Sequence, residues 1–184
     1  MQKIGFSLYT EMLEEAVAAI RSGRTPNIDL QSDNAIELNL RIPALIPDDY
    51  LPDVHTRLIM YKRIASARDE EELQDLQVEM IDRFGLLPGP VKLLFEQTRL
   101  KLRAACYGIK KIDANVSSGR IEFNQHTPVD PMSLVELIQQ DPQTYKLGSA
   151  NQLQFKHNGS EPQQKLKLIG DLLDKFRLGK KQAA

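Results

Sequence analysis

Two consecutive amphipathic stretches between residues 69 and 108 constrain the fold more than any other feature of the sequence. The first begins with a capping-box-like pair, Asp69 and Glu72, and ends at Gly85. Its apolar residues recur at helical spacing, at Leu73, Leu76, Met80 and Phe84. The second begins around Pro88 and Pro90 and runs to Gly108, with a stripe at Val91, Leu94, Phe95, Thr98, Leu102 and Ala105. The spacing predicts two successive helices, each with one buried face.

Four further segments show helical spacing. The pattern predicts a helix over residues 6–21, a second one after Pro52, a short helix opened by Asp130, and a last helix capped by Ser160 and Gln163 that ends at Gly179. The second carries its stripe at Val54, Leu58, Tyr61, Ile64 and Ala65. The short helix carries Leu134, Val135 and Ile138, and the last one carries Leu166, Ile169, Leu173 and Phe176.

Apolar and polar residues alternate in three regions, the period of a strand with one solvated face. The first region is 36–42. In the second region the alternation predicts a hairpin, in which a two-residue turn at Ser118 and Gly119 pairs Val116 with Ile121. The third predicts a hairpin with Tyr145 and Leu147 facing Phe155 and Leu153. We therefore expect an α+β fold, with a helix-rich first half packed with antiparallel hairpins in the second half.

The pattern also predicts how the chain is organised. The helix over 1–21 has no visible cap, as expected if the natural chain continued upstream. Residues 22–34 are rich in turn-forming residues and have no periodicity, which is typical of a linker. The main domain then covers 35–184.

Composition excludes several classes of protein. With 24 basic and 25 acidic residues the formal net charge is −1, so no global positive field attracts nucleic acid. The longest apolar run, 16–20, is far shorter than the ~18 residues of a membrane span, and the first 20 residues lack the pattern of a secretory signal. A single cysteine, Cys106, fits a reducing compartment, and we expect a cytoplasmic protein.

The sequence has no motif of an enzyme. It contains no phosphate-binding loop, zinc-binding helix, Cys-x-x-Cys pair or nucleophile elbow. His55, His126 and His157 are too widely spaced to suggest a metal site, and Cys106 is interpreted as a structural thiol. We expect no catalytic, cofactor-binding or metal-binding residue in this chain.

Four carboxylates form the most informative surface pattern. Glu72, Asp75, Glu79 and Asp82 are spaced by three, four and three residues, which places them on one flank of the helix predicted over 69–85. They are either a solvated helix face or a site that recognises a basic partner. Glu79 and Asp82 favour recognition most, because they lie beyond the first turn, where the helix dipole no longer explains acidity.

Basic residues gather on the following helix and offer an alternative function. Lys92, Arg99, Lys101 and Arg103 precede Lys110 and Lys111, so the segment from Lys92 to Lys111 is a candidate nucleic-acid-binding surface. Glu96 interrupts it and no exposed aromatic residue interleaves with it, which favours a solvated helix face.

Several motifs resemble a known family. They are Glu-Leu-Asn-Leu at 37–40, Pro-Ala-Leu-Ile-Pro-Asp-Asp-Tyr at 43–50, Tyr-Lys-Arg-Ile-Ala at 61–65 and Glu-Met-Ile-Asp-Arg-Phe-Gly at 79–85. The chain resembles the C-terminal domain of the bacterial transcription-repair coupling factors, strongly over 37–109 and weakly after about 112. Residues 4–9 resemble the end of the motor module that precedes this domain.

The resemblance implies a parent protein that is an ATP-dependent DNA translocase, using ATP and Mg, which acts on stalled RNA polymerase and recruits repair through UvrA. It implies that this domain docks on the N-terminal UvrB-like module of the same protein and masks UvrA binding. The expected partners are thus that module within the chain and, for the parent, UvrA, RNA polymerase and double-stranded DNA. The isolated chain is expected to be a monomer without its own cofactor.

Overall fold

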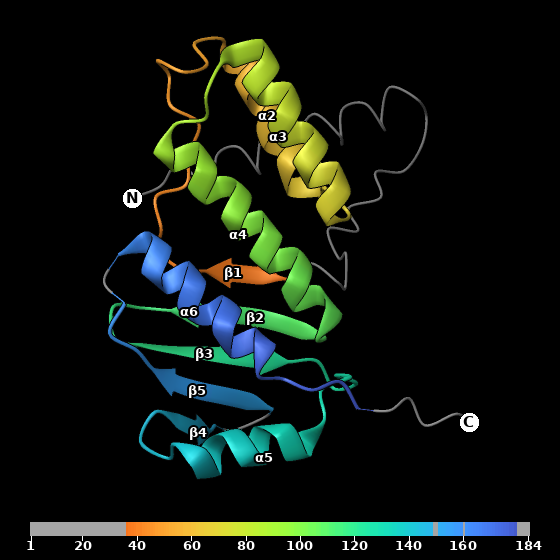
Figure 1. Cartoon of the computed structure of the whole chain (residues 1–184), viewed down its shortest axis with the longest axis vertical. Helices are drawn as coiled ribbons and strands as arrows, with labels where there is room; N and C mark the ends of the chain where they lie inside the picture. The colour runs from red at the N-terminus through yellow and green to blue at the C-terminus, as the bar shows by residue number, and fades with distance from the viewer. Residues whose placement is uncertain (1–35, 149–150, 160, 180–184) are drawn as a thin grey trace, which may run out of the picture. The chain divides into compact units, whose positions relative to one another are not determined.

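The computed structural model describes residues 36–148, 151–159 and 161–179, which contain five helices and five strands (Figure 1). The helices are α2 (Val54–Ser66), α3 (Glu70–Phe84), α4 (Gly89–Cys106), α5 (Pro131–Gln140) and α6 (Pro162–Asp174). The strands are β1 (Glu37–Asn39), β2 (Ile109–Ala114), β3 (Ser118–Phe123), β4 (Tyr145–Leu147) and β5 (Gln152–Lys156). The helix predicted over 6–21, the linker predicted over 22–34 and the predicted cap Ser160 lie outside the described residues. The α+β class is confirmed.

The five strands form one mixed sheet in the order β1-β2-β3-β5-β4. The two predicted hairpins, β2–β3 and β4–β5, are antiparallel, and so is the β3–β5 pair. The pair β1–β2 is parallel, so antiparallel pairing does not extend to the whole sheet. The physical reason is that helices α2, α3 and α4 connect these two strands, and a long helical crossover returns the chain in the same direction.

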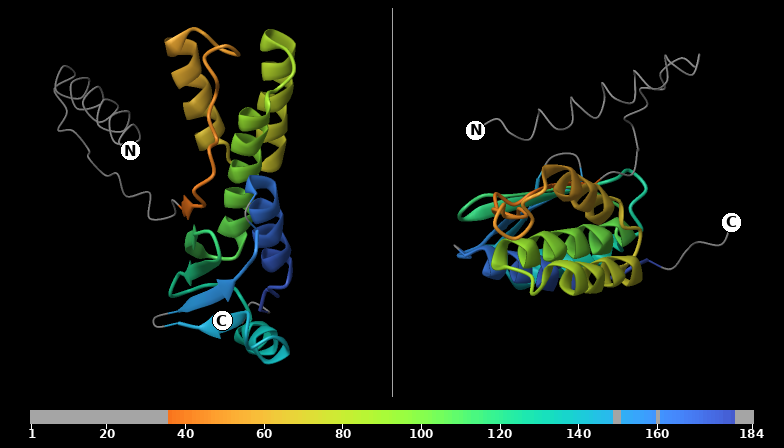
Figure 2. Two further views of the ribbon diagram at one scale, coloured as in Figure 1. Left: turned by 90° about the vertical axis from the view of Figure 1, so that its left-hand side faces the viewer. Right: turned by 90° about the horizontal axis from the view of Figure 1, so that it is seen from above.

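Helix α4 runs from the pair α2 and α3 to the sheet and α6 (Figure 2), and it contributes to two hydrophobic cores. Its first half contributes Val91 and Phe95 to a core shared with α2 and α3. Its second half contributes Leu100 and Ala104 to a core built on the sheet and α6. The stripe predicted for this helix is therefore correct at Val91, Phe95 and Thr98 but wrong at Ala105, which is exposed, because the end of α4 faces the sheet and α6 through Ala104.

Helix α3 confirms its prediction. The Asp69 carboxylate accepts a hydrogen bond from the Glu72 backbone N–H at 2.8 Å, and the Glu72 carboxylate accepts one from the Arg68 N–H at 2.9 Å. Leu73, Leu76 and Met80 are buried. Gly85 ends the helix with a positive φ of 89°, a conformation that glycine adopts without a steric penalty.

The buried face predicted for α2 is correct at Ile64 and at the partly buried Tyr61, but wrong at Val54, Leu58 and Ala65. Met60 and Ile64 are buried, whereas Val54 is 58% exposed and Leu58 is 52% exposed, and Ala65 is exposed too. The helix is rotated relative to the predicted stripe because it packs on α3 and α4 through Met60 and Ile64.

The first hairpin turns earlier than predicted. Ile112 pairs with Ile121 and Ala114 with Gly119, so Ser118 and Gly119 belong to β3 and the turn lies at residues 116–117. Asn115 makes the turn, because its side-chain oxygen accepts hydrogen bonds from the N–H groups of residues 117 and 118. Val116, predicted to pair with Ile121, is 72% exposed in the turn.

The second hairpin and the last helix agree with the sequence more closely. Tyr145 pairs with Phe155 and Leu147 with Leu153, as predicted. Leu166, Ile169, Leu173 and Phe176 are all buried. The helix α6 is shorter than predicted: Glu161 is its N-cap, without a side-chain cap bond, and it ends at Asp174 rather than near Gly179. The short helix α5 is capped by Asp130 as predicted, but it buries Leu137 and leaves Val135 exposed.

Candidate protein-interaction surface

Helix α3 carries all four predicted interface residues, but the structure gives them different environments. Glu72 caps its own helix through the bond to Arg68. Glu79 makes two hydrogen bonds with the Arg63 guanidinium of α2, at 2.8 and 2.7 Å, and a third with Arg83 at 2.8 Å. These two residues are therefore bound within the domain.

The electrostatics of Glu79 follow from those contacts. Hydrogen bonds from Arg63 and then Arg83 lower the pKa of the Glu79 carboxyl from 4.5 to about 2, against a smaller opposing effect of burial. The pKa of Arg63 is raised by the same contact. Glu79 is thus a fixed negative charge that ties α2 to α3, with 31% of its side chain exposed.

Asp75 and Asp82 are the two carboxylates left for a partner. Both are exposed, and neither has a hydrogen bond or ion pair within the described part of the chain. They lie seven residues apart, so two helical turns bring them to one outward side about 10 Å apart along the axis. The surface that we call the acidic flank is formed by Asp75, Asp82 and the exposed edge of Glu79.

The basic alternative surface is largely neutralised. Its cations pair with carboxylates of the domain in four groups, namely Arg99 with Glu70 and Glu96, Arg103 with Asp174, Lys110 with Glu122 and Lys111 with Glu37. Lys92 and Lys101 are the members of this set that have no ion pair among the described residues. On α4 itself Arg99 and Arg103 are paired, which leaves Lys92 and Lys101 for phosphates.

The described residues contain no cluster of His, Cys, Asp or Glu that could hold a metal ion. In the same part of the chain no helix is long and apolar enough to cross a membrane. Cys106 is exposed at the end of α4, where its thiol lies 3.7 Å from the Leu102 carbonyl oxygen.

Sequence reasoning missed two features of this surface. The partners of Glu79 were not identified, although Arg83, four residues on, is at the spacing of a helical ion pair. Arg63 lies on another helix, and no local spacing reveals it. The exposed side of α2 was missed as well, because its apolar residues were assigned to the core.

Comparison with known proteins then identifies the family. The model of the TRCF domain matches residues 40–134, just over half of the chain. The chain belongs to the transcription-repair-coupling factor family. The transcription-repair-coupling factor of Escherichia coli K12 is 45% identical over 169 residues, which are 92% of this chain and 15% of that protein. That of Haemophilus influenzae is 42% identical, over 94% of this chain and 15% of the relative.

The chain therefore spans about 15% of the length of these transcription-repair-coupling factors. A solved structure described as the C-terminal domain of transcription-repair coupling factor has the same fold, with a TM-score of 0.63 and 22% identity. The match covers 76% of this chain and 91% of that domain.

Proposed function

We propose that this chain is the non-catalytic regulatory domain of its transcription-repair coupling factor, which docks on the N-terminal UvrB-like module and masks UvrA binding. The parent protein would be an ATP-dependent DNA translocase of the cytoplasm that acts on stalled RNA polymerase. In this proposal ATP, Mg and DNA are bound by other parts of the parent. The family membership and the absence of enzyme motifs in the sequence support a regulatory role.

The acidic flank of α3 is the observation that carries the proposal. Asp75 and Asp82 are exposed charges with no partner among the described residues, on a helix that Glu79 fixes to α2. A pair of exposed carboxylates on a helical backbone suits a basic protein surface, because the backbone that carries them needs no further ordering on binding. A partly desolvated charge pair contributes ~1.5 kcal/mol or more to such docking, whereas an exposed rim pair contributes less than ~1 kcal/mol.

The proposed nucleic-acid function of the segment from Lys92 to Lys111 is not favoured. Arg99, Arg103, Lys110 and Lys111 already have carboxylate partners within the domain. Net charge −1 adds no long-range attraction to phosphates.

The test is charge reversal in the parent protein. Asp75→Lys/Asp82→Lys should weaken docking about tenfold, and UvrA binding by the parent should become stronger. Thermal stability should stay within a few degrees of the parent's, because both side chains are exposed and have no ion pair in the part of the chain that the structure describes. Reversing Glu79 would be a poorer probe, since a lysine there would face Arg63 and Arg83 and would disturb the fold itself.

Asp171→Lys is the control for the single reversals Asp75→Lys and Asp82→Lys, because Asp171 is an exposed aspartate in the last turn of α6, away from the acidic flank. It should leave UvrA binding unchanged. If the double reversal leaves UvrA binding unchanged while the domain stays folded, the acidic flank is a solvated surface and the proposal is wrong.

A further inference from the structure

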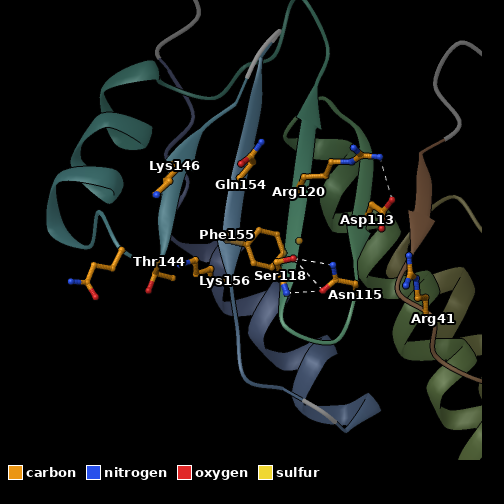
Figure 3. Close-up of a pocket in the computed structure, with 12 residues that line it drawn as sticks. Arg41, Asp113, Asn115, Ser118, Arg120, Thr144, Lys146, Gln154, Phe155 and Lys156 are labelled. Carbon is orange, nitrogen blue, oxygen red and sulfur yellow. Dashed lines mark hydrogen bonds and ion pairs between the residues drawn. The ribbon is translucent and has the colours of Figure 1, made fainter.

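The sheet has one polar face, opposite the face on which its core side chains pack. In register, Asp113 lies beside Arg120, Arg120 beside Gln154, and Gln154 beside Lys146, which gives a row of polar side chains from β2 to β4. Arg120, Gln154 and Lys146 are exposed. Figure 3 shows this row together with the neighbouring Ser118 and Lys156. The alternate residues of β3 and β5, Ile121 and Leu153, are buried in the core.

This face holds a hollow of about 400 Å³. Four cationic side chains line it, those of Arg41, Arg120, Lys146 and Lys156, and the side chains of Thr144 and Gln154 add a hydroxyl and an amide. Asp113 also lines the hollow and is paired with Arg120, so the charged side chains of the lining carry a net charge of +3, which suits an anionic ligand.

The positive charge of this face exceeds its negative charge. Its three carboxylates are each held by a neighbouring cation, in the pairs Glu37–Lys111 at 2.8 Å, Asp113–Arg120 at 3.4 Å and Glu122–Lys110 at 3.6 Å. Arg41, Lys146 and Lys156 have no ion-pair partner in the described part of the chain. Their three charges are available to an external ligand.

A buried lysine of α6 lies beside the Arg41 end of this face. Lys165 is 7% exposed, and its ammonium donates to the Leu40 carbonyl oxygen at 3.0 Å. No carboxylate pairs with it among the described residues. Burial, and next the charge of Arg41, lower the pKa of Lys165.

Arg41 follows that carbonyl directly and has a left-handed backbone, with φ of 55°. This conformation is uncommon for a residue other than glycine, asparagine or aspartate, and residues held in it are found preferentially at binding sites.

We propose that this hollow binds an extended acidic segment of a protein. From β1 to β4 the sheet measures about 19 Å, four spacings of ~4.8 Å, so about six residues of extended peptide would cross it. Alternate side chains of such a peptide are ~6.6 Å apart and face one side, so four acidic side chains would span about 20 Å, from the Arg41 side of the sheet to Lys156 and Lys146.

Nucleic acid suits the hollow less well than a peptide does. No aromatic side chain of the described residues is exposed on this face to stack with bases. Three cations without an ion pair among the described residues are also few for a polyphosphate, whose binding rests on many phosphate contacts, and the net charge of −1 adds no general attraction. The proposal concerns the sheet and does not depend on the acidic flank of α3.

The test uses the full chain and a labelled peptide of about eight residues in which Asp and Glu alternate with Ser, followed by fluorescence anisotropy. The peptide should bind, and its counterpart with Asn and Gln should not. Lys146→Gln/Lys156→Gln should weaken binding about fivefold or more. Lys92→Gln/Lys101→Gln, which removes the same charge from α4, should change binding less than about twofold.

Three outcomes would overturn the proposal. The first is equal binding of the acidic and the amide peptide. The second is equal weakening by the two lysine pairs, which would mean that only overall charge matters. The third is tighter binding of a duplex oligonucleotide than of the acidic peptide through Lys146 and Lys156, which would assign the hollow to nucleic acid. Circular dichroism of each variant confirms that a loss of binding is not a loss of folding.

Discussion

Replacing Glu79 by glutamine tests the ion pairs that tie α2 to α3. Glutamine keeps the size and an accepting oxygen but removes the charge that Arg63 and Arg83 contact at 2.7–2.8 Å. The pKa of Glu79 falls from 4.5 to about 2, which for a fully buried group would correspond to about 3 kcal/mol of stability. Since 31% of the side chain is exposed and solvent screens the pairs, we expect Glu79→Gln to lower the free energy of unfolding by about 1 kcal/mol near pH 7.

The effect should depend on pH with a defined sign. The carboxyl has a lower pKa in the folded chain than in the unfolded one, so the unfolded chain takes up the proton first as the pH falls. The stabilisation is therefore complete above pH 4.5 and is lost progressively between 4.5 and about 2. Urea unfolding followed by circular dichroism should show a gap of about 1 kcal/mol between the two proteins near pH 7 and a smaller gap near pH 3.

Asp82→Asn provides the control on the same helix. Asp82 is exposed and has no ion pair within the described residues, so removing its charge should change the free energy of unfolding by less than about 0.5 kcal/mol. The reasoning is refuted if Glu79→Gln costs no more than Asp82→Asn near pH 7, or if its cost is the same at both pH values.

Two further changes test a close contact within the sheet and the titration of a buried histidine. Gly119→Ala would place a Cβ 2.3 Å from the Phe155 ring, which is almost fully buried, so it should cost ~2 kcal/mol or more and lower the melting temperature by several degrees; an unchanged melt would contradict this close approach. Burial, and next the charge of Lys165, lower the pKa of His157 from 6.5, so the unfolded chain takes up the proton first and stability should fall as the pH drops below about 6.5. His157→Leu has no such group, so its free energy of unfolding should fall less between about pH 7.5 and 5.5 than that of the unchanged protein. Urea unfolding at the two pH values measures this, and an equal fall in both proteins would disprove the prediction.

Helices with strong terminal signals were predicted well from the sequence. Helix α3 begins after Asp69, whose side chain caps it, and ends at Gly85, which has a positive φ. Both signals are local and can be read from the sequence. The face of α2 had no such local determinant. Val54 and Leu58 lie at helical spacing, as do Met60 and Ile64, and only the packing against α3 and α4 decides which pair is buried.

The first hairpin shows why Gly119 was wrongly predicted to lie in the turn. Ser118 and Gly119 resemble a two-residue turn. Position 119 is nevertheless in β3, and a glycine fits there because the Phe155 ring of β5 occupies the space that a side chain would need. That contact joins residues far apart in the sequence, which local turn chemistry does not reveal. The signal that marks the turn is Asn115, whose side chain bonds the backbone two and three residues on.

The candidate site was predicted as a set of residues but not as a set of roles. Helical spacing places Glu72, Asp75, Glu79 and Asp82 on one flank, since it depends only on the helix. Which of them remain available depends on groups that pack against the helix. Arg63 lies sixteen residues before Glu79 on another helix and removes Glu79 from the available set.

The net charge of −1 describes the whole chain but not the surfaces that a partner meets. Most charged side chains near the two candidate surfaces neutralise one another, as in the pairs of Glu79 with Arg63 and of Arg120 with Asp113. The charges left over are segregated, with Asp75 and Asp82 on α3 and Lys146 and Lys156 on the polar face of the sheet. At physiological ionic strength, screening limits the field of each group of charges to about 8–10 Å. One nearly neutral domain can therefore bind a basic partner at α3 and an acidic partner at the sheet.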